Sequence, residues 1–100
     1  MTIQEFAELV ERQQLDRMKQ EFPDYPPGQA EHDYKTKVVP GRKYTKVDVG
    51  TSGKFMIDAE GNIFGIKGYG VIHKGHRYGN LATVEFWDWS AYEPVSRIAP

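Results

Sequence analysis

The feature that most constrains the fold is a hairpin pattern in the middle of the chain. Two runs typical of strands, residues 54–58 and 62–67, flank the short connection of Ala59, Glu60 and Gly61. Gly61 can supply the positive φ of a tight connection, and the side chain of Asp58 can bond to the backbone of the turn. The pattern predicts an antiparallel pair, and Gly65 inside the second run predicts a bulge or a close backbone contact.

A further strand is predicted immediately before this hairpin. Residues 43–49 alternate between two faces, with Tyr44, Lys46 and Asp48 on one and Thr45, Val47 and Val49 on the other. This period of two is typical of a half-buried strand. Residues 51–53 are predicted to turn the chain toward the hairpin.

Residues 2–22 predict a helix. Thr2 and Glu5 have the spacing of a capping box, and Pro23 disfavours helix beyond Phe22. Two apolar stripes lie on the helix, one of Ile3, Phe6, Ala7 and Val10 and one of Leu15, Met18 and Phe22. Two stripes indicate either a bend near Gln13 and Gln14 or two packing partners, for example the chain's own sheet and another chain.

The remaining segments complete an α+β fold in one domain. Residues 23–42 are rich in Pro and Gly and predict a connecting arm, in which 35–39 could add a short edge strand. Residues 43–100 form a β-rich body, so we expect one antiparallel sheet of three to five strands. Its tail, 81–92, is predicted as a last strand or a short helix.

The aromatic tail also bears on self-association. Phe86, Trp87, Trp89 and Tyr92 suit a segment that closes the core or an oligomer interface. A chain of 100 residues has a small core, and its helix has two apolar stripes. Together these features predict a homodimer.

A cationic, glycine-rich stretch is the main candidate for function. No Asp or Glu lies between Gly61 and Val84, whereas bases and tyrosines alternate there with glycines. Glycines allow close backbone approach, cations attract phosphate or carboxylate, and tyrosines can stack. We therefore predict that residues 67–80 form a mobile binding loop for an anionic ligand or partner, through Lys67, Tyr69, His73, Lys74, His76, Arg77 and Tyr78.

The charge distribution points the same way. Residues 1–33 carry a net charge of −5, residues 34–84 carry +6, and residues 85–100 carry −2. Such asymmetry indicates an acidic partner for the basic part, or packing of the acidic helix on the basic sheet of the same or a second subunit. A nucleic-acid partner stays open, although binders of this class are usually basic overall.

A resemblance adds an expected origin. Lys43 and Tyr44 in a strand, the Asp-x-x-Gly hairpin at Asp58 and the Gly-x-Arg-Tyr element at Gly75, which leads to Leu81, resemble small phage-encoded proteins of unknown role. The resemblance covers residues 43–81 and implies a β-rich body and a bacteriophage or mobile-element origin. It further implies an accessory factor or an inhibitor of host machinery or defence, and it assigns no site residue.

Other kinds of site find weaker support. His73 and His76 supply only two ligands where zinc needs three or four, so no metal or cofactor is expected. A nuclease or hydrolase with a histidine base is chemically feasible, but no second positioned group is evident. A virion or assembly component is a third alternative. The leading expectation is a non-enzymatic binding protein.

Composition limits the setting. The absence of cysteine excludes disulfides, thiolate metal sites and cysteine nucleophiles. No apolar run is long enough to span a bilayer, and the N-terminus lacks the order of a signal peptide. We therefore expect a cytoplasmic protein in a host cell, without a membrane partner.

Overall fold

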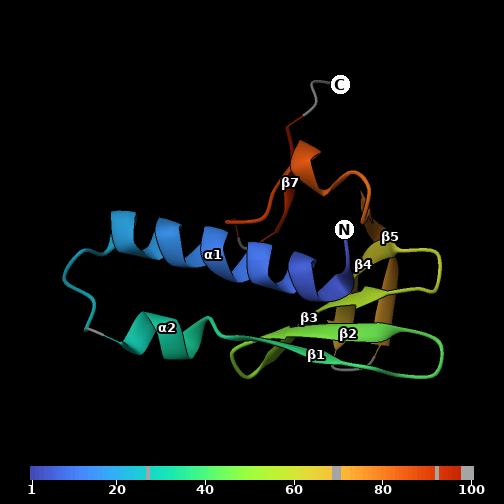
Figure 1. The fold of residues 1–100 in the computed structure, drawn as a ribbon, viewed down its shortest axis with the longest axis horizontal. Coiled ribbons are helices and arrows are strands. Elements are labelled where there is room, and N and C mark those ends of the chain that lie inside the picture. The colour runs from blue at the N-terminus through green and yellow to red at the C-terminus, as the bar shows by residue number, and fades with distance from the viewer. Residues whose placement is uncertain (27, 69–70, 92, 98–100) are drawn as a thin grey trace.

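The fold is α+β, with one long helix packed on a five-stranded antiparallel sheet (Figure 1). The structure is a computed structural model that describes residues 1–26, 28–68, 71–91 and 93–97. The strand order follows the chain from β1 to β5, and a two-stranded sheet pairs β6 with β7. The elements are α1 (Ile3–Glu21), α2 (Gln29–Asp33), β1 (Thr36–Val39), β2 (Thr45–Val49), β3 (Ser52–Ile57), β4 (Asn62–Gly68), β5 (Val71–Asn80), the 3₁₀ helix η1 (Val84–Phe86), β6 (Trp87–Asp88) and β7 (Val95–Ser96).

The predicted helix is confirmed. Thr2 accepts a hydrogen bond from the backbone N–H of Glu5 at 3.1 Å, and the Glu5 carboxylate accepts one from the backbone N–H of Thr2 at 2.9 Å. This reciprocal pair satisfies two donors that the first turn leaves free. Phe6, Ala7 and Val10, from the first apolar stripe, are fully buried against the sheet.

The second apolar stripe has a partner within the same chain. Met18 and Phe22 line a pocket together with Pro23 and Ala30, so this part of α1 faces the segment that contains α2. Phe22 nevertheless keeps 55% of its surface exposed. The stripe therefore no longer requires a second subunit, and the homodimer stays a prediction.

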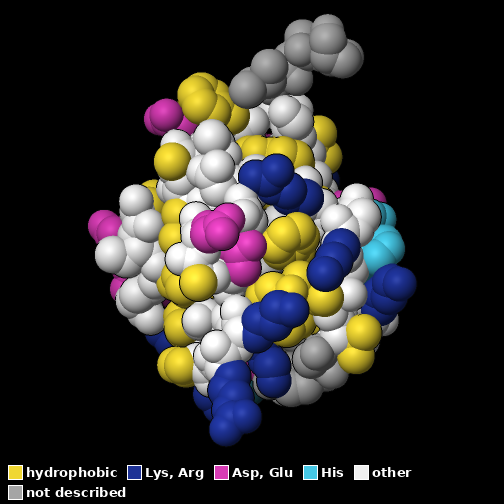
Figure 2. Space-filling view, turned by 90° about the vertical axis from the view of Figure 1, so that its right-hand side faces the viewer, with side chains coloured by type: hydrophobic (Ala, Val, Ile, Leu, Met, Phe, Trp, Pro, Cys, Tyr) yellow, Lys and Arg dark blue, Asp and Glu magenta, His cyan; other side chains and the backbone are white. Residues whose placement is uncertain are grey.

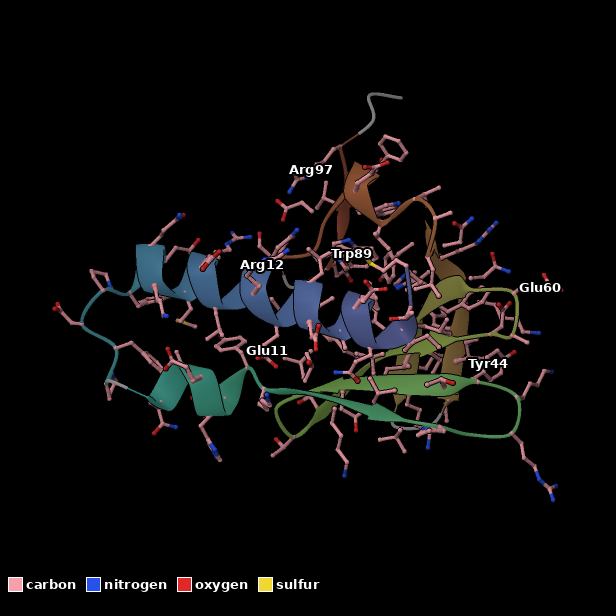
Figure 3. All side chains as sticks on the ribbon, viewed as in Figure 1. Glu11, Arg12, Tyr44, Glu60, Trp89 and Arg97 are labelled. Carbon is pink, nitrogen blue, oxygen red and sulfur yellow. The ribbon has the colours of Figure 1, made fainter. Side chains whose placement is uncertain are left out.

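Gln13 and Gln14 tie the helix to the C-terminal segment. The backbone N–H of Trp89 donates to the Gln13 side chain at 2.9 Å, and the Gln14 side chain donates to the Trp89 carbonyl at 3.2 Å. The Trp89 indole is fully buried and donates to the carbonyl of Val84 at 2.9 Å. Trp89 lies beside α1 in Figure 3. Trp89 therefore closes the core, one of the two predicted roles of the tail, after a 3₁₀ turn and a short strand. Phe86 is exposed, and Tyr92 lies outside the described residues.

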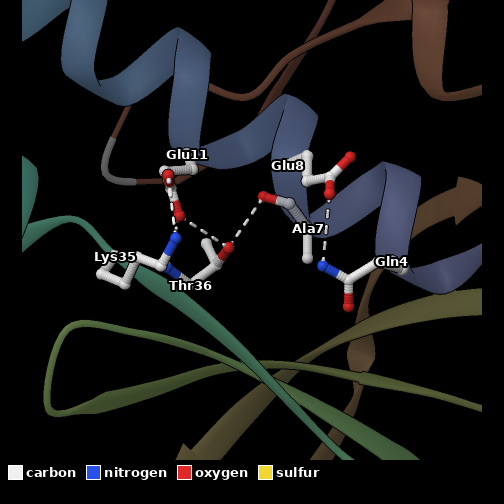
Figure 4. Close-up of polar contacts among 6 residues, drawn as sticks. All are labelled: Gln4, Ala7, Glu8, Glu11, Lys35 and Thr36. Carbon is white, nitrogen blue, oxygen red and sulfur yellow. Dashed lines mark hydrogen bonds and ion pairs between the residues drawn. The ribbon is translucent and has the colours of Figure 1, made fainter.

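The first edge strand is attached to α1 by a carboxylate. Glu11 accepts from the backbone N–H of Thr36 at 2.8 Å and from its hydroxyl at 3.1 Å, and Lys35 lies 3.8 Å away (Figure 4). This confirms the short edge strand expected within 35–39. The proline-rich arm predicted for 23–42 is not confirmed, because α2 and β1 lie within that range.

The central hairpin is confirmed in register and turn chemistry. Met56 pairs with Phe64, Ile57 pairs with Ile63, and Gly61 has a φ of +86°. Asp58 accepts from the backbone N–H groups of Glu60 at 3.0 Å and Asn62 at 2.9 Å. The turn predicted at 51–53 lies earlier, because Gly50 takes the positive φ and β3 already begins at Ser52.

The core lies between α1, one face of the sheet and Trp89. Its aromatic centre consists of Phe6, Phe55 and Trp89, whose ring centroids lie 4.8 to 5.5 Å apart in edge-on contacts. Val47, Ile57 and Ile63 extend the same cluster along the sheet. The alternation predicted for residues 43–49 is thus confirmed for Val47 and Val49, which face this core.

Candidate functional site

The predicted mobile loop is wrong as a structural assignment. Residues 71–80 form strand β5, which pairs with β4, and only residues 69 and 70 separate the two strands. The strand is held because Tyr78 packs edge-on against Phe55, at 6.0 Å between centroids, and against Trp87, at 5.7 Å. Tyr69 lies outside the described residues.

β5 is nevertheless irregular where the histidines lie. Gly65 pairs with His73, but the residue that precedes it in β4, Phe64, pairs with Arg77. Three residues, Lys74, Gly75 and His76, therefore lie between partners of two consecutive residues of β4. We name residues 73–77 the β5 bulge. Bulges of edge strands re-aim side chains, so this one removes His76 and Lys74 from the regular ladder.

Gly65 makes room for this arrangement. A Cβ atom at Gly65 would lie 3.1 Å from the Tyr78 hydroxyl and 3.2 Å from the Cβ of His76. Both distances are tighter than ordinary contacts, so a side chain would push the bulge away from β4. The prediction of a bulge or a close contact at Gly65 is confirmed on both counts.

The bulge places two histidines in contact beside a pocket. The rings of His73 and His76 lie 3.9 Å apart between centroids, at an interplanar angle of 65°. Both line a pocket of about 210 Å³, whose other charged or titratable members are Lys54, Tyr78 and Glu93. Such a volume suits a phosphate or carboxylate group rather than a drug-sized ligand.

The pocket contains one lysine and one glutamate, so its charge depends on the protonation of its other titratable groups. Burial lowers the pKa of His73, and the nearby charges of His76 and Lys67 lower it further. Burial also lowers the pKa of Lys54, while the charge of Glu93 acts in the opposite direction. Burial raises the pKa of Tyr78, and Glu93 adds to that shift. A bound anion would relieve the repulsion that His73 experiences.

The structure divides the predicted site residues between two sides of the sheet. His73, His76 and Tyr78 meet at the pocket, on the side that α1 covers, and Lys74 is exposed in the bulge. Arg77 pairs with Phe64 on the opposite side, where it donates to the Asn62 side chain at 2.7 Å. Lys67 is exposed near the end of β4. Tyr78 packs among core rings and is not a freely accessible stacking surface.

Lys54 and Glu93 line the pocket, although they were not among the site residues predicted from the sequence. Val47 pairs with Phe55 and Asp48 pairs with Gly53, so Lys54 is an extra residue in β3. No spacing in the sequence signals that irregularity. Glu93 follows the buried Trp89 in a segment whose position depends on tertiary packing.

The arrangement restricts the possible chemistry. Among the described residues, no group of three or more His, Cys, Asp or Glu side chains could hold a metal ion. The two imidazoles contact each other, so no phosphoryl group can lie between them with a base on one side and an acid on the other. Within the same described part of the chain, no helix is long and apolar enough to cross a membrane.

Comparisons with known proteins give no further assignment. No family model, curated protein or solved structure matches the chain. The expected phage origin therefore stays a prediction.

Proposed function

We propose that the protein is a non-enzymatic binding module that holds an anionic group, of the phosphate or carboxylate class, in the pocket beside the β5 bulge. The observation that carries the proposal is the contact of His73 with His76 at one pocket that also contains Lys54. Protonated imidazoles and an ammonium group donate charge-assisted hydrogen bonds to such anions. The role as a phage accessory factor or inhibitor remains an extension of this proposal.

Glu93 limits the affinity of the pocket for anions. Its carboxylate lines the same pocket and repels an anion, while it attracts Lys54. We expect binding to strengthen as the pH falls, because protonation of His73 adds a positive charge that offsets this acid. A nuclease or hydrolase is a weaker candidate, because the two rings touch instead of flanking a space.

The test is an NMR titration of the histidine ring protons with inorganic phosphate, and with acetate as the carboxylate probe. Phosphate should shift the signals of His73 and His76 and raise the pKa of His73. The affinity of the variant H73Q/H76Q for phosphate should be lower by a factor of about ten or more, which corresponds to the loss of at least one charged hydrogen bond. H32Q serves as the matched control, since His32 lies in α2.

A second variant gives an effect of opposite sign. E93Q removes an exposed acid from the pocket and should strengthen phosphate binding. If neither anion shifts the signals of His73 and His76 at millimolar concentration, or if H73Q/H76Q binds as well as H32Q, the proposal is wrong.

A further inference from the structure

The sheet has a second apolar surface, on the face opposite α1. Directly opposed residues in antiparallel strands share a face, so the register defines one row across all five strands: Val39, Lys46, Met56, Phe64 and Arg77. The pair of Ile66 and Ile72 extends this face along β4 and β5, where Ile66 also borders the pocket of His73 and His76, and Lys37 extends it along β1. We name these eight residues the open face.

The open face is separate from the core. Met56 is only 5% exposed, yet neither Met56 nor Phe64, Ile66 and Ile72 belong to the core cluster that α1 and Trp89 complete. Val39, Phe64, Ile66 and Ile72 are half-buried. Apolar side chains that lie together outside the core, with polar residues at the margin, are typical of an interaction surface.

The exposed charged side chains of the open face are cationic. Lys37 and Arg77 are exposed, and Lys46 lies in the row itself. Asp48, which is opposite Lys37, is 8% exposed, and the Asp58 carboxylate is occupied by the backbone of its turn. On a neighbouring side of the molecule, Figure 2 shows hydrophobic side chains next to Lys and Arg and also next to Asp and Glu. The exposed charge of the open face is therefore positive.

We propose that the open face binds single-stranded nucleic acid. Phe64 lies in the row between Met56 and Arg77 and offers a ring for base stacking, while Lys37, Lys46 and Arg77 supply phosphate contacts. A second copy packed face to face would oppose cations with cations, which is unfavourable. This proposal goes beyond the anion pocket and does not depend on it.

The dimensions favour a single strand over a duplex. Neighbouring strands lie about 4.8 Å apart, so five strands extend over roughly 19 Å. The major groove of a duplex is only about 12 Å wide and cannot admit such a sheet face. Unstacked bases of a single strand can instead lie along the row.

The test measures fluorescence anisotropy with a labelled oligothymidylate of about 12 nucleotides, within the range of known single-strand sites. Three phosphate contacts predict a loss of about 20-fold in affinity between about 50 and 200 mM salt. K37Q/R77Q should reduce the dependence on salt to about one third. F64L should weaken binding about fivefold or more and leave that dependence unchanged. An oligouridylate of equal length shows whether RNA is preferred.

The control removes the same charge elsewhere. R12Q/K19Q lies on α1, away from the sheet face, and should bind as the wild type does. Circular dichroism confirms that every variant is folded. The proposal is overturned if no oligonucleotide binds at low salt, if R12Q/K19Q weakens binding as much as K37Q/R77Q, or if a duplex or polyglutamate binds equally well. Self-association that F64L abolishes would also overturn it. None of these results affects the histidine titration with phosphate.

Discussion

The two hairpins that share β4 differ in what holds them. In the β3–β4 hairpin, Ile57 pairs with Ile63, both side chains are in the core, and Asp58 and Gly61 specify the turn. In the β4–β5 hairpin, Ile66 pairs with Ile72 outside the core cluster, and the register shifts three times. The first hairpin is therefore a structural element, whereas the second gives up regular pairing to carry exposed charged residues. We therefore place the proposed anion site in the second hairpin.

The largest effect should come from truncating the buried isoleucine. I63A removes a side chain with no exposed surface and should lower the free energy of unfolding by about 2–5 kcal/mol. I66A is the matched change in the same strand. I66A should lower the free energy of unfolding by about 1 kcal/mol or less, because truncation of a partly exposed side chain leaves no closed cavity. Urea unfolding followed by tryptophan fluorescence measures both, and equal losses would contradict the comparison.

A smaller effect should separate the glycines of the two hairpins. Gly61 has a φ of +86°, so G61A should cost about 1–2 kcal/mol through backbone strain alone. Gly75 lies in the β5 bulge, where the nearest atom to an added Cβ is the Nε2 of His73 at 3.7 Å. G75A should change stability by less than about 0.5 kcal/mol. Melting temperatures check this, and a loss at Gly75 as large as that at Gly61 would mean that the bulge is structural.

The smallest effect concerns pH and the bulge alone. The pKa of His73 in the folded protein lies below its ordinary value of 6.5, mainly through burial, with His76 and Lys67 adding repulsion. At pH values between the pKa of His73 in the folded protein and its pKa of about 6.5 in the unfolded chain, the unfolded chain binds more protons. The free energy of unfolding should therefore rise with pH and level off above about 6.5. Urea unfolding at several pH values measures the slope.

Substitution identifies the group responsible for that slope. H73Q should remove this component, whereas H32Q controls for the loss of a histidine elsewhere, in α2. Saturating phosphate should reduce the slope in the wild type, because a bound anion raises the pKa of His73 again. A slope that H73Q leaves unchanged would assign the effect to another group.

The sequence by itself determined the elements whose contacts are local. The capping box joins Thr2 and Glu5, and the hairpin turn joins Asp58 to Glu60 and Asn62, so each is complete within a few residues. Alternation likewise identified Val47 and Val49 as core residues. These features need no knowledge of the rest of the chain, because their hydrogen bonds and their burial pattern are encoded in neighbouring positions.

Only the tertiary structure decided which side of the sheet each cation occupies. The stretch 67–80 has the composition of a loop, but Tyr78 packs on Phe55 and Trp87 and holds residues 71–80 as a strand. The register shift between Gly65 and Phe64 then turns His73 toward the pocket and Arg77 toward the open face. Gln13 and Gln14 bind Trp89 across more than seventy positions. Contacts this distant depend on how the whole core packs, which no local pattern specifies.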